Sequence, residues 1–171
     1  MTLTIFLLGV NHAHQYPDHR LGSSDALAAF LFGQVEKHGI DLLAEEMSVE
    51  ALRREGCHQS TVQVVARRTN IAHVFLDPDS AERSALGIPS YDEIKARRGL
   101  GKYVFEDDAA KLKVAEREHW GTREAEWVRR LDAAQFARAL AVVGSKHVES
   151  LSATLHLRNH AVTILTAKWE A

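Results

Sequence analysis

Two segments near opposite ends of the chain share the pattern Gly-x-x-His. Residues 9–12 read Gly-Val-Asn-His, and residues 144–147 read Gly-Ser-Lys-His. Each follows an apolar run, residues 3–8 and residues 139–143, that is too short and too aliphatic for an amphipathic helix. Each run is therefore predicted to be a buried strand that ends at a glycine and then presents a histidine.

The two histidines of these motifs, His12 and His147, are predicted to lie at the same edge of the sheet. In an open α/β sheet, ligands bind beyond the carboxyl ends of the strands. Two imidazoles at that edge can hold a metal ion or transfer protons. One histidine at a strand end is commonly only a capping or partly buried residue, but the repeated pattern favours a joint functional role.

Acidic residues end two further predicted strands. Glu45 and Glu46 follow residues 40–44, and Asp77 follows residues 71–76. Because successive side chains on a strand face opposite sides of the sheet, at most one of the two glutamates points into the site, and the sequence does not decide which. Asp77 could act at the same edge or serve as the N-cap of the next helix.

A charged segment lies on a predicted helix before the second histidine motif. Glu124, Trp127 and Leu131 recur at spacings of three and four, so Glu124 falls on the face that must be buried, with Arg123 beside it. Charged groups that point inward need partners. They could form a structural pair, or Arg123 could hold a substrate anion while Glu124 takes part in acid–base chemistry.

Strands and helices alternate along the rest of the chain. Apolar periodicity and caps predict helices over about 23–38, 48–55, 60–68, 78–86, 107–119, 121–134 and 148–158, and a last strand over 162–167. This order predicts a three-layer α/β fold, a mostly parallel sheet of about five strands with helices on both faces. We expect a single domain, residues 1–171, in which the charge-rich residues 89–119 form a lid or an insertion.

Composition limits the functions open to the chain. The 171 residues are 46% hydrophobic, which suits one domain with a core but is too short for a typical eight-fold barrel. A formal net charge of -2 leads us to expect neither nucleic acid nor a membrane as a partner. One cysteine, Cys57, excludes an internal disulfide and a thiolate metal cluster. No basic residue precedes the first apolar run and no cleavage site follows it, so we expect a cytoplasmic location.

The motifs together resemble a known superfamily over nearly the whole chain. Paired GxxH motifs, an acidic end to the second strand and an Arg/Glu-bearing helix are similar to the TraB/TIKI and erythromycin-esterase/ChaN-like superfamily, and nearest to small bacterial cytosolic members. Similar short stretches are Glu-Glu-Met at 45–47, Asp-Pro-Asp at 77–79, Leu-Gly-Ile-Pro at 86–89 and Arg-Glu-Ala-Glu-Trp at 123–127. The resemblance implies metal-dependent peptidase or esterase-like hydrolysis in some members and haem binding in ChaN-like ones. The residues it implies are His12, His147 and one of Glu45 and Glu46.

The leading hypothesis is a hydrolase that acts on a small molecule or a peptide. His12, His147 and Glu45 are the candidate ligands of a divalent metal, zinc or manganese, which would lower the pKa of a bound water. The candidate catalytic residues are acidic or cationic groups near that edge: Glu124, Arg123, Glu46 and Asp77. A metal-free version uses one histidine as the base and carboxylates to orient it.

Two other interpretations use the same residues. The pocket could bind or sense a small molecule without chemistry, for example haem with His12 or His147 as a ligand. The His-Ala-His at 12–14 matches the strand-end HxH of amidohydrolase and PHP metal sites, although their barrel does not fit this length. The apolar last strand and Trp169 suggest an edge through which a homo-oligomer could form.

Overall fold

Five parallel strands form one sheet in the computed structural model, which describes residues 3–17, 24–99 and 106–170. The order across the sheet is β3-β2-β4-β1-β5, and every described strand pair is parallel. The strands are β1 (Thr4–Val10), β2 (Leu42–Glu45), β3 (Ala72–Phe75), β4 (Arg138–Gly144) and β5 (Ala161–Thr166). With helices on both faces, this is the three-layer α/β fold that the sequence predicts.

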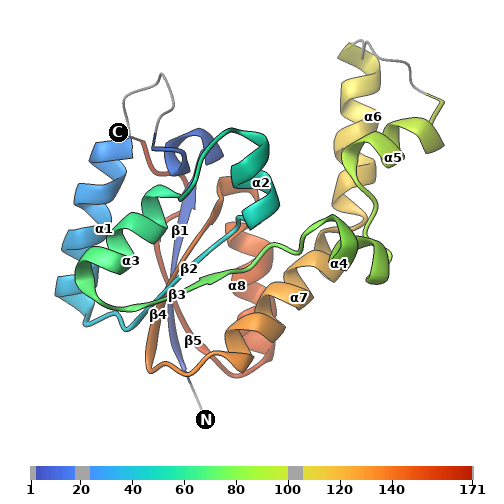
Figure 1. Cartoon of the computed structure of the whole chain (residues 1–171). Coiled ribbons are helices and arrows are strands. Elements are labelled where there is room, and N and C mark those ends of the chain that lie inside the picture. Colours follow the sequence, from blue (N-terminus) through green and yellow to red (C-terminus); the bar gives the residue numbers. More distant parts are fainter. Residues whose placement is uncertain (1–2, 18–23, 100–105, 171) are drawn as a thin grey trace.

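Four helices cover the two faces of the sheet (Figure 1). α1 (Ser24–His38) and α3 (Thr61–Thr69) pack on one face, and α7 (Trp120–Ala133) and α8 (Val148–Leu157) pack on the other. Each face has its own apolar core because strand side chains alternate between the two sides. None of the described helices is long and apolar enough to cross a membrane.

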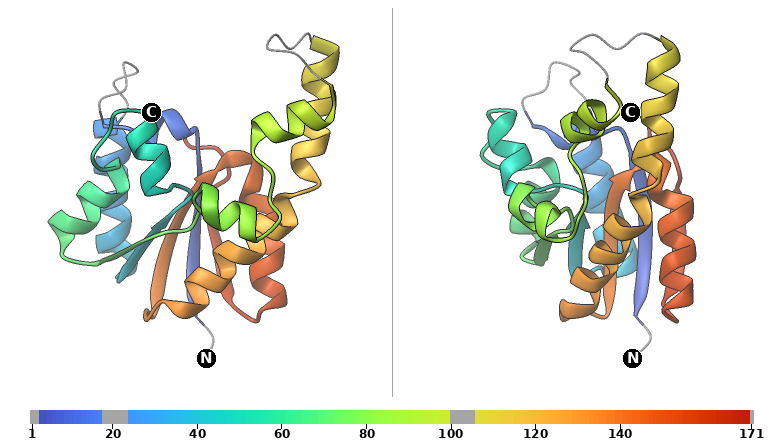
Figure 2. Two further views of the ribbon diagram at one scale, coloured as in Figure 1. Left: turned by 45° about the vertical axis from the view of Figure 1, so that its right-hand side comes forward. Right: turned by 90° about the vertical axis from the view of Figure 1, so that its right-hand side faces the viewer.

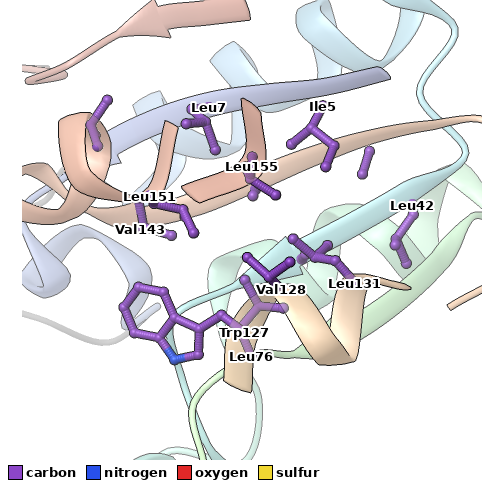
Figure 3. Packing of buried hydrophobic residues seen from close by; sticks show 14 residues of the cluster. Ile5, Leu7, Leu42, Leu76, Trp127, Val128, Leu131, Val143, Leu151 and Leu155 are labelled. Atoms are coloured by element: carbon purple, nitrogen blue, oxygen red, sulfur yellow. The ribbon is translucent and has the colours of Figure 1, made fainter. Parts of the chain in front are cut away.

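The core on the α7 and α8 face lies close to the site described below. Figure 3 shows Trp127 and Leu131 of α7 opposite Leu7 of β1 and Leu151 of α8. All four side chains are fully buried. This packing fixes α7 against the sheet, so that charged residues on the same helix face are held at the carboxyl edge of the strands.

The two central strands, β1 and β4, lie side by side, and the chain leaves them toward opposite faces. The register runs from the Thr4–Arg138 pair to the Val10–Gly144 pair. After β1 the chain continues to α1 on one face, and after β4 it continues to α8 on the other. Such a topological switch opens a crevice beyond the carboxyl ends of the strands. Both Gly-x-x-His motifs end at this crevice.

Short elements connect the main ones. They are the 3-10 turns η1 (His12–Gln15) and η2 (Ser145–His147) and the helices α2 (Val49–Arg54), α4 (Ser80–Ala85), α5 (Tyr91–Arg97) and α6 (Glu106–Arg117). Figures 1 and 2 show α5 and α6 projecting beyond the sheet as an arm that joins the rest of the molecule near α7. The arm has a small core of its own, formed by Ile94, Leu112 and Ala115.

Two local predictions are corrected by capping. The helix expected from Pro78 begins at Ser80 instead, because Asp79 and Glu82 form a reciprocal capping box. Asp79 rather than Asp77 is therefore the N-cap. In the first half of residues 89–119, where the sequence shows little helical period, α5 forms behind another capping box that begins at Ser90.

Candidate functional site

A pocket of about 620 Å³ lies at the carboxyl edge of β1, β2 and β4. Its volume is in the range of small-molecule sites. Its floor is formed by His12, Glu46, Arg123, Gly144 and His147. Its walls include residues of the arm and of the segment after β5: Tyr91, Ile94, Glu116, His119, Lys168 and Trp169. The segment predicted as a lid or insertion therefore supplies one wall of the pocket, although its residues 100–105 lie outside the described part of the chain.

The Glu46 carboxylate lies at the centre of the pocket floor, and the other floor residues are arranged around it. The residue is 4% exposed, and its carboxylate accepts hydrogen bonds from Arg123 Nη2 at 2.8 Å and from the backbone N–H of Gly144 at 2.7 Å. Its Oε1 also lies 3.5 Å from His12 Nε2 and 3.8 Å from His147 Nε2. Burial would raise the pKa of Glu46, but His12 and Arg123 outweigh it and hold that pKa well below its usual range. Glu46 is therefore an ionised, fixed anion.

The glycines of the two motifs make these close approaches possible. A Cβ on Gly144 would lie 2.8 Å from His12 Nε2 and 3.1 Å from Glu46 Oε2, so only glycine leaves room for these groups as they stand. A Cβ on Gly9 would lie 2.0 Å from the carbonyl oxygen of Ala167. The chain after β5 crosses β1 at this point, and Trp169 N–H donates to Gly9 O at 2.7 Å. Gly144 lets the His12 ring and the Glu46 carboxylate lie close to the end of β4. Gly9 lets the segment after β5, which forms a wall of the pocket, pack against β1.

His147 is buried and is held by a carboxylate on α7. Its Nδ1 lies 2.7 Å from Glu124 Oε1, and Glu124 also accepts from Ser150 Oγ at 2.7 Å. A carboxylate only accepts hydrogen bonds, so the proton sits on Nδ1 and Nε2 faces the pocket. The ring of Trp120 packs on the imidazole at 4.4 Å. Glu124 is 2% exposed, on the buried helix face that its spacing predicts.

His12 is held in a similar way by a neutral side chain. Its Nδ1 lies 2.8 Å from Gln15 Oε1, one turn later in η1, and its Nε2 faces Glu46. The side chain is 44% exposed, whereas that of His147 is 6% exposed. Desolvation would lower the pKa of His12, but the Glu46 carboxylate and the hydrogen bond to Gln15 raise it above its usual value of 6.5. His12 therefore keeps its proton to a higher pH than an ordinary imidazole does.

Arg123 and Asp77 form the support of Glu46. Arg123 Nε donates to Asp77 Oδ1 at 2.7 Å while Nη2 reaches Glu46, and its guanidinium stacks over Trp127 at 5.1 Å. Asp77 also accepts from Arg83 and from Trp127 Nε1. Because Asp77 already accepts from three donors, it holds Arg123 in position and is not a group that contacts a substrate.

Glu45 lies on the opposite side of the sheet from the pocket. It is fully buried and accepts hydrogen bonds from Ser60 Oγ, from His73 Nε2 at 2.8 Å and from Gln15 Nε2 at 3.0 Å. Alternation along β2 sends Glu46 to the pocket and Glu45 away from it. The expected ligand set of His12, His147 and Glu45 is therefore not brought together.

The donor set of the pocket does not complete a metal site. Within residues 3–17, 24–99 and 106–170, no three His, Cys, Asp or Glu side chains are grouped so as to hold a metal ion. The nearest carboxylate to both imidazoles is Glu46, which Arg123 and Gly144 already occupy with donors. Two imidazole nitrogens without a third ligand fall short of the three protein ligands of a typical catalytic zinc site.

Sequence analysis missed three polar residues of this region, namely Gln15, Ser60 and His73. Gln15 carried a usable signal, because a residue three positions after His12 lies on the same side of a helical turn. Ser60 lies at the start of the helix predicted over 60–68, where a serine is typical as an N-cap, and His73 lies inside a strand with no pattern that marks its partner.

Comparison of the chain with protein-family models, with curated proteins and with solved structures found no match. The chemistry of the pocket is therefore the basis for a functional assignment.

Proposed function

We propose that the protein is a hydrolase of ester or amide bonds in small molecules or peptides, and that the pocket at the carboxyl edge of the sheet is its active site. One observation carries the proposal. Two imidazoles, each with Nδ1 held by its own acceptor, present Nε2 to the same buried anion at 3.5 and 3.8 Å. Paired titratable groups in unlike surroundings are the usual basis of acid–base catalysis.

His147 is assigned as the general base. Its Nε2 removes a proton from a water molecule, whose oxygen then bonds to the carbonyl carbon of the substrate. Glu124 accepts from Nδ1–H at 2.7 Å, so it orients the ring and stabilises the imidazolium that forms. Because His147 lies among Trp120 and Trp127, its orientation is also fixed by packing.

His12 is assigned as the general acid. The Glu46 carboxylate favours the protonated imidazole, which can give its Nε2 proton to the leaving group as the bond between that group and the carbonyl carbon breaks. Afterwards His147 releases the proton taken from water and His12 regains one from solvent, so the pair returns to its starting state. Arg123 keeps Glu46 in place and adds positive charge to the pocket floor.

No step of the proposed reaction goes through a metal, because the described residues hold no group of three metal ligands and the oxygens of Glu46 already accept from Arg123 and Gly144. This separates it from the metal-dependent hydrolysis that the resemblance to the TraB/TIKI and ChaN-like superfamily implies. The Lys146 side chain is exposed and lines the pocket, so it is available to a substrate without disturbing the floor.

The test is hydrolysis of a panel of carboxylic esters and short peptides, with and without a metal chelator. We expect turnover of at least one substrate class, insensitive to chelator and lost in His147→Ala. His156→Ala, an exposed histidine on α8, is the matched control and should keep full activity. Absence of turnover across the panel, or equal activity in His147→Ala and wild type, would contradict the proposal. Activity that a chelator abolishes and zinc or manganese restores would favour the metal-dependent reaction instead.

A further inference from the structure

A line of hydrogen bonds leads from the pocket to the other side of the sheet. It runs from His12 Nδ1 to Gln15 Oε1 at 2.8 Å, and from Gln15 Nε2 to Glu45 Oε2 at 3.0 Å. Gln15 and Glu45 are both fully buried, so neither can exchange its partner for solvent. The line ends at Ser60 and His73, which donate to the other oxygen of Glu45.

The direction of each hydrogen bond in this line follows from chemistry. A carboxylate has no proton to give, so Glu45 must meet the NH₂ group of Gln15 rather than its oxygen. The amide oxygen of Gln15 is then turned toward His12. An oxygen at 2.8 Å from Nδ1 requires that Nδ1 carry the hydrogen. Nε2 also faces an acceptor, Glu46 Oε1, but at 3.5 Å, against 2.8 Å between Nδ1 and Gln15 Oε1. The closer acceptor keeps the hydrogen of neutral His12 on Nδ1, so the lone pair is on Nε2, the nitrogen that faces the pocket.

We propose that Glu45 and Gln15 are positioning residues that fix the tautomer of His12 from the far side of the sheet. This inference deepens the proposed function, since the tautomer decides whether His12 can regain a proton on Nε2 after each turnover. It also gives a role to Glu45, which is buried and does not reach the pocket. One oxygen of its carboxylate accepts from Ser60 and His73, and the other accepts from the NH₂ group of Gln15, which turns the Gln15 oxygen toward His12.

An isosteric change at Glu45 should reverse the direction of the hydrogen bonds along this line without leaving a buried polar group unpaired. In Glu45→Gln, the oxygen that faces Ser60 and His73 can remain an oxygen, and the other position becomes an NH₂ group. That NH₂ group requires the oxygen of Gln15, so Gln15 turns over and offers its own NH₂ group to His12. Nδ1 must then accept, and the hydrogen of neutral His12 moves to Nε2. All buried polar groups of the line remain paired, so folding should be retained.

The experiment is nitrogen-15 NMR of the His12 ring at a pH where His12 is neutral, on wild type, Glu45→Gln and Gln15→Leu, each checked for folding by thermal melting. Wild type should show a protonated Nδ1 and an unprotonated Nε2, and Glu45→Gln should show the reverse. Gln15→Leu removes the acceptor at Nδ1 and should shift the hydrogen toward Nε2, which still faces Glu46. Glu149→Gln, an exposed residue of α8, is the isosteric control and should match wild type.

The results separate this inference from the proposed function. An unprotonated Nδ1 in wild type, or an unchanged tautomer in folded Glu45→Gln, overturns it. If Glu45→Gln fails to fold, Gln15→Leu decides, and a pure wild-type tautomer there overturns the inference. Where a hydrolysed substrate is found, kcat should fall at least tenfold in Glu45→Gln with KM nearly unchanged, because the pocket itself is intact. The expected tautomers without any hydrolysis would contradict the proposed function and leave the inference standing.

Discussion

The two Gly-x-x-His motifs are alike in sequence, but their histidines have different surroundings. His147 is buried, is backed by the carboxylate of Glu124 and packs on two tryptophan rings. His12 is half-exposed, is backed by the amide of Gln15 and lies closer to Glu46. A carboxylate behind an imidazole helps it to accept a proton, whereas an anion in front of it keeps a proton in place. The same motif can thus supply a base at one strand end and an acid at the next.

Changes at the two glycines should give the largest effects and should differ in kind. In Gly9→Ala the new Cβ meets backbone at 2.0 Å, which cannot move without displacing the chain after β5. We expect the free energy of unfolding to fall by about 3 kcal/mol or more. In Gly144→Ala the new Cβ meets the His12 ring, which can turn aside. Here we expect about 1 kcal/mol of destabilisation and a loss of activity. Urea denaturation and initial rates measure both, and equal stability losses would argue against this distinction.

Changes at the histidines should separate base from acid through the leaving group. His147→Ala should lower kcat by about 10²- to 10⁴-fold for every substrate, because attack by water always needs the base. His12→Ala should do the same for alkyl esters and peptides. It should cost about tenfold or less for nitrophenyl esters, whose leaving group departs without a proton. Identical losses for both kinds of ester in His12→Ala would show that His12 is not the acid.

A change at Arg123, which holds Glu46 in place, should have a smaller effect on activity and stability. Arg123→Lys keeps the charge but cannot bridge Asp77 and Glu46 through two nitrogens of one planar group. We expect kcat to fall about tenfold and the unfolding free energy to fall by about 1–2 kcal/mol. Arg129→Lys, whose arginine pairs with Glu126 outside the pocket, is the control for the same change on α7. A larger loss in the control variant would contradict the assignment of Arg123.

Acid should weaken the fold through Glu46. Its pKa is lower in the folded protein than its usual value of 4.5, so the stabilisation it gives is present above that value and is lost as the pH falls toward the folded-state pKa. Between pH 5 and pH 3, wild type should lose more unfolding free energy than Glu46→Gln, which has no proton to take up. Parallel losses, measured by urea denaturation at each pH, would contradict this cause.

The fold, and the sheet edge at which the site lies, are predictable from the sequence because both depend on local patterns of residues. Short apolar runs closed by glycine predict β1 and β4, and the alternation of strands and helices predicts the parallel sheet with helices on both faces. The burial of Glu124 follows from its spacing to Trp127. Each of these features depends on residues close to one another along the chain.

Contacts between residues that are far apart in the sequence could not be predicted in this way. Which of Glu45 and Glu46 faces the pocket depends on the exact end of β2, since a shift by one residue exchanges the two sides. Asp77 and Arg123 are 46 positions apart, and only the packing of α7 on the sheet brings them together. The helix α5 was missed because its apolar period is weak, although the capping box at Ser90 marks its start.

The central claim, that Glu46 keeps His12 protonated so that it can act as an acid, is tested most directly by the pH dependence of kcat/KM. An acid works below its pKa, so the raised pKa of His12 extends activity to higher pH in wild type. In Glu46→Gln the carboxylate is lost and the pKa of His12 should fall, which moves the alkaline limb of the profile to lower pH. Glu116→Gln, which changes another carboxylate of the pocket wall, should leave that limb in place. An alkaline limb that does not move in Glu46→Gln, or that moves equally in Glu116→Gln, would contradict the account.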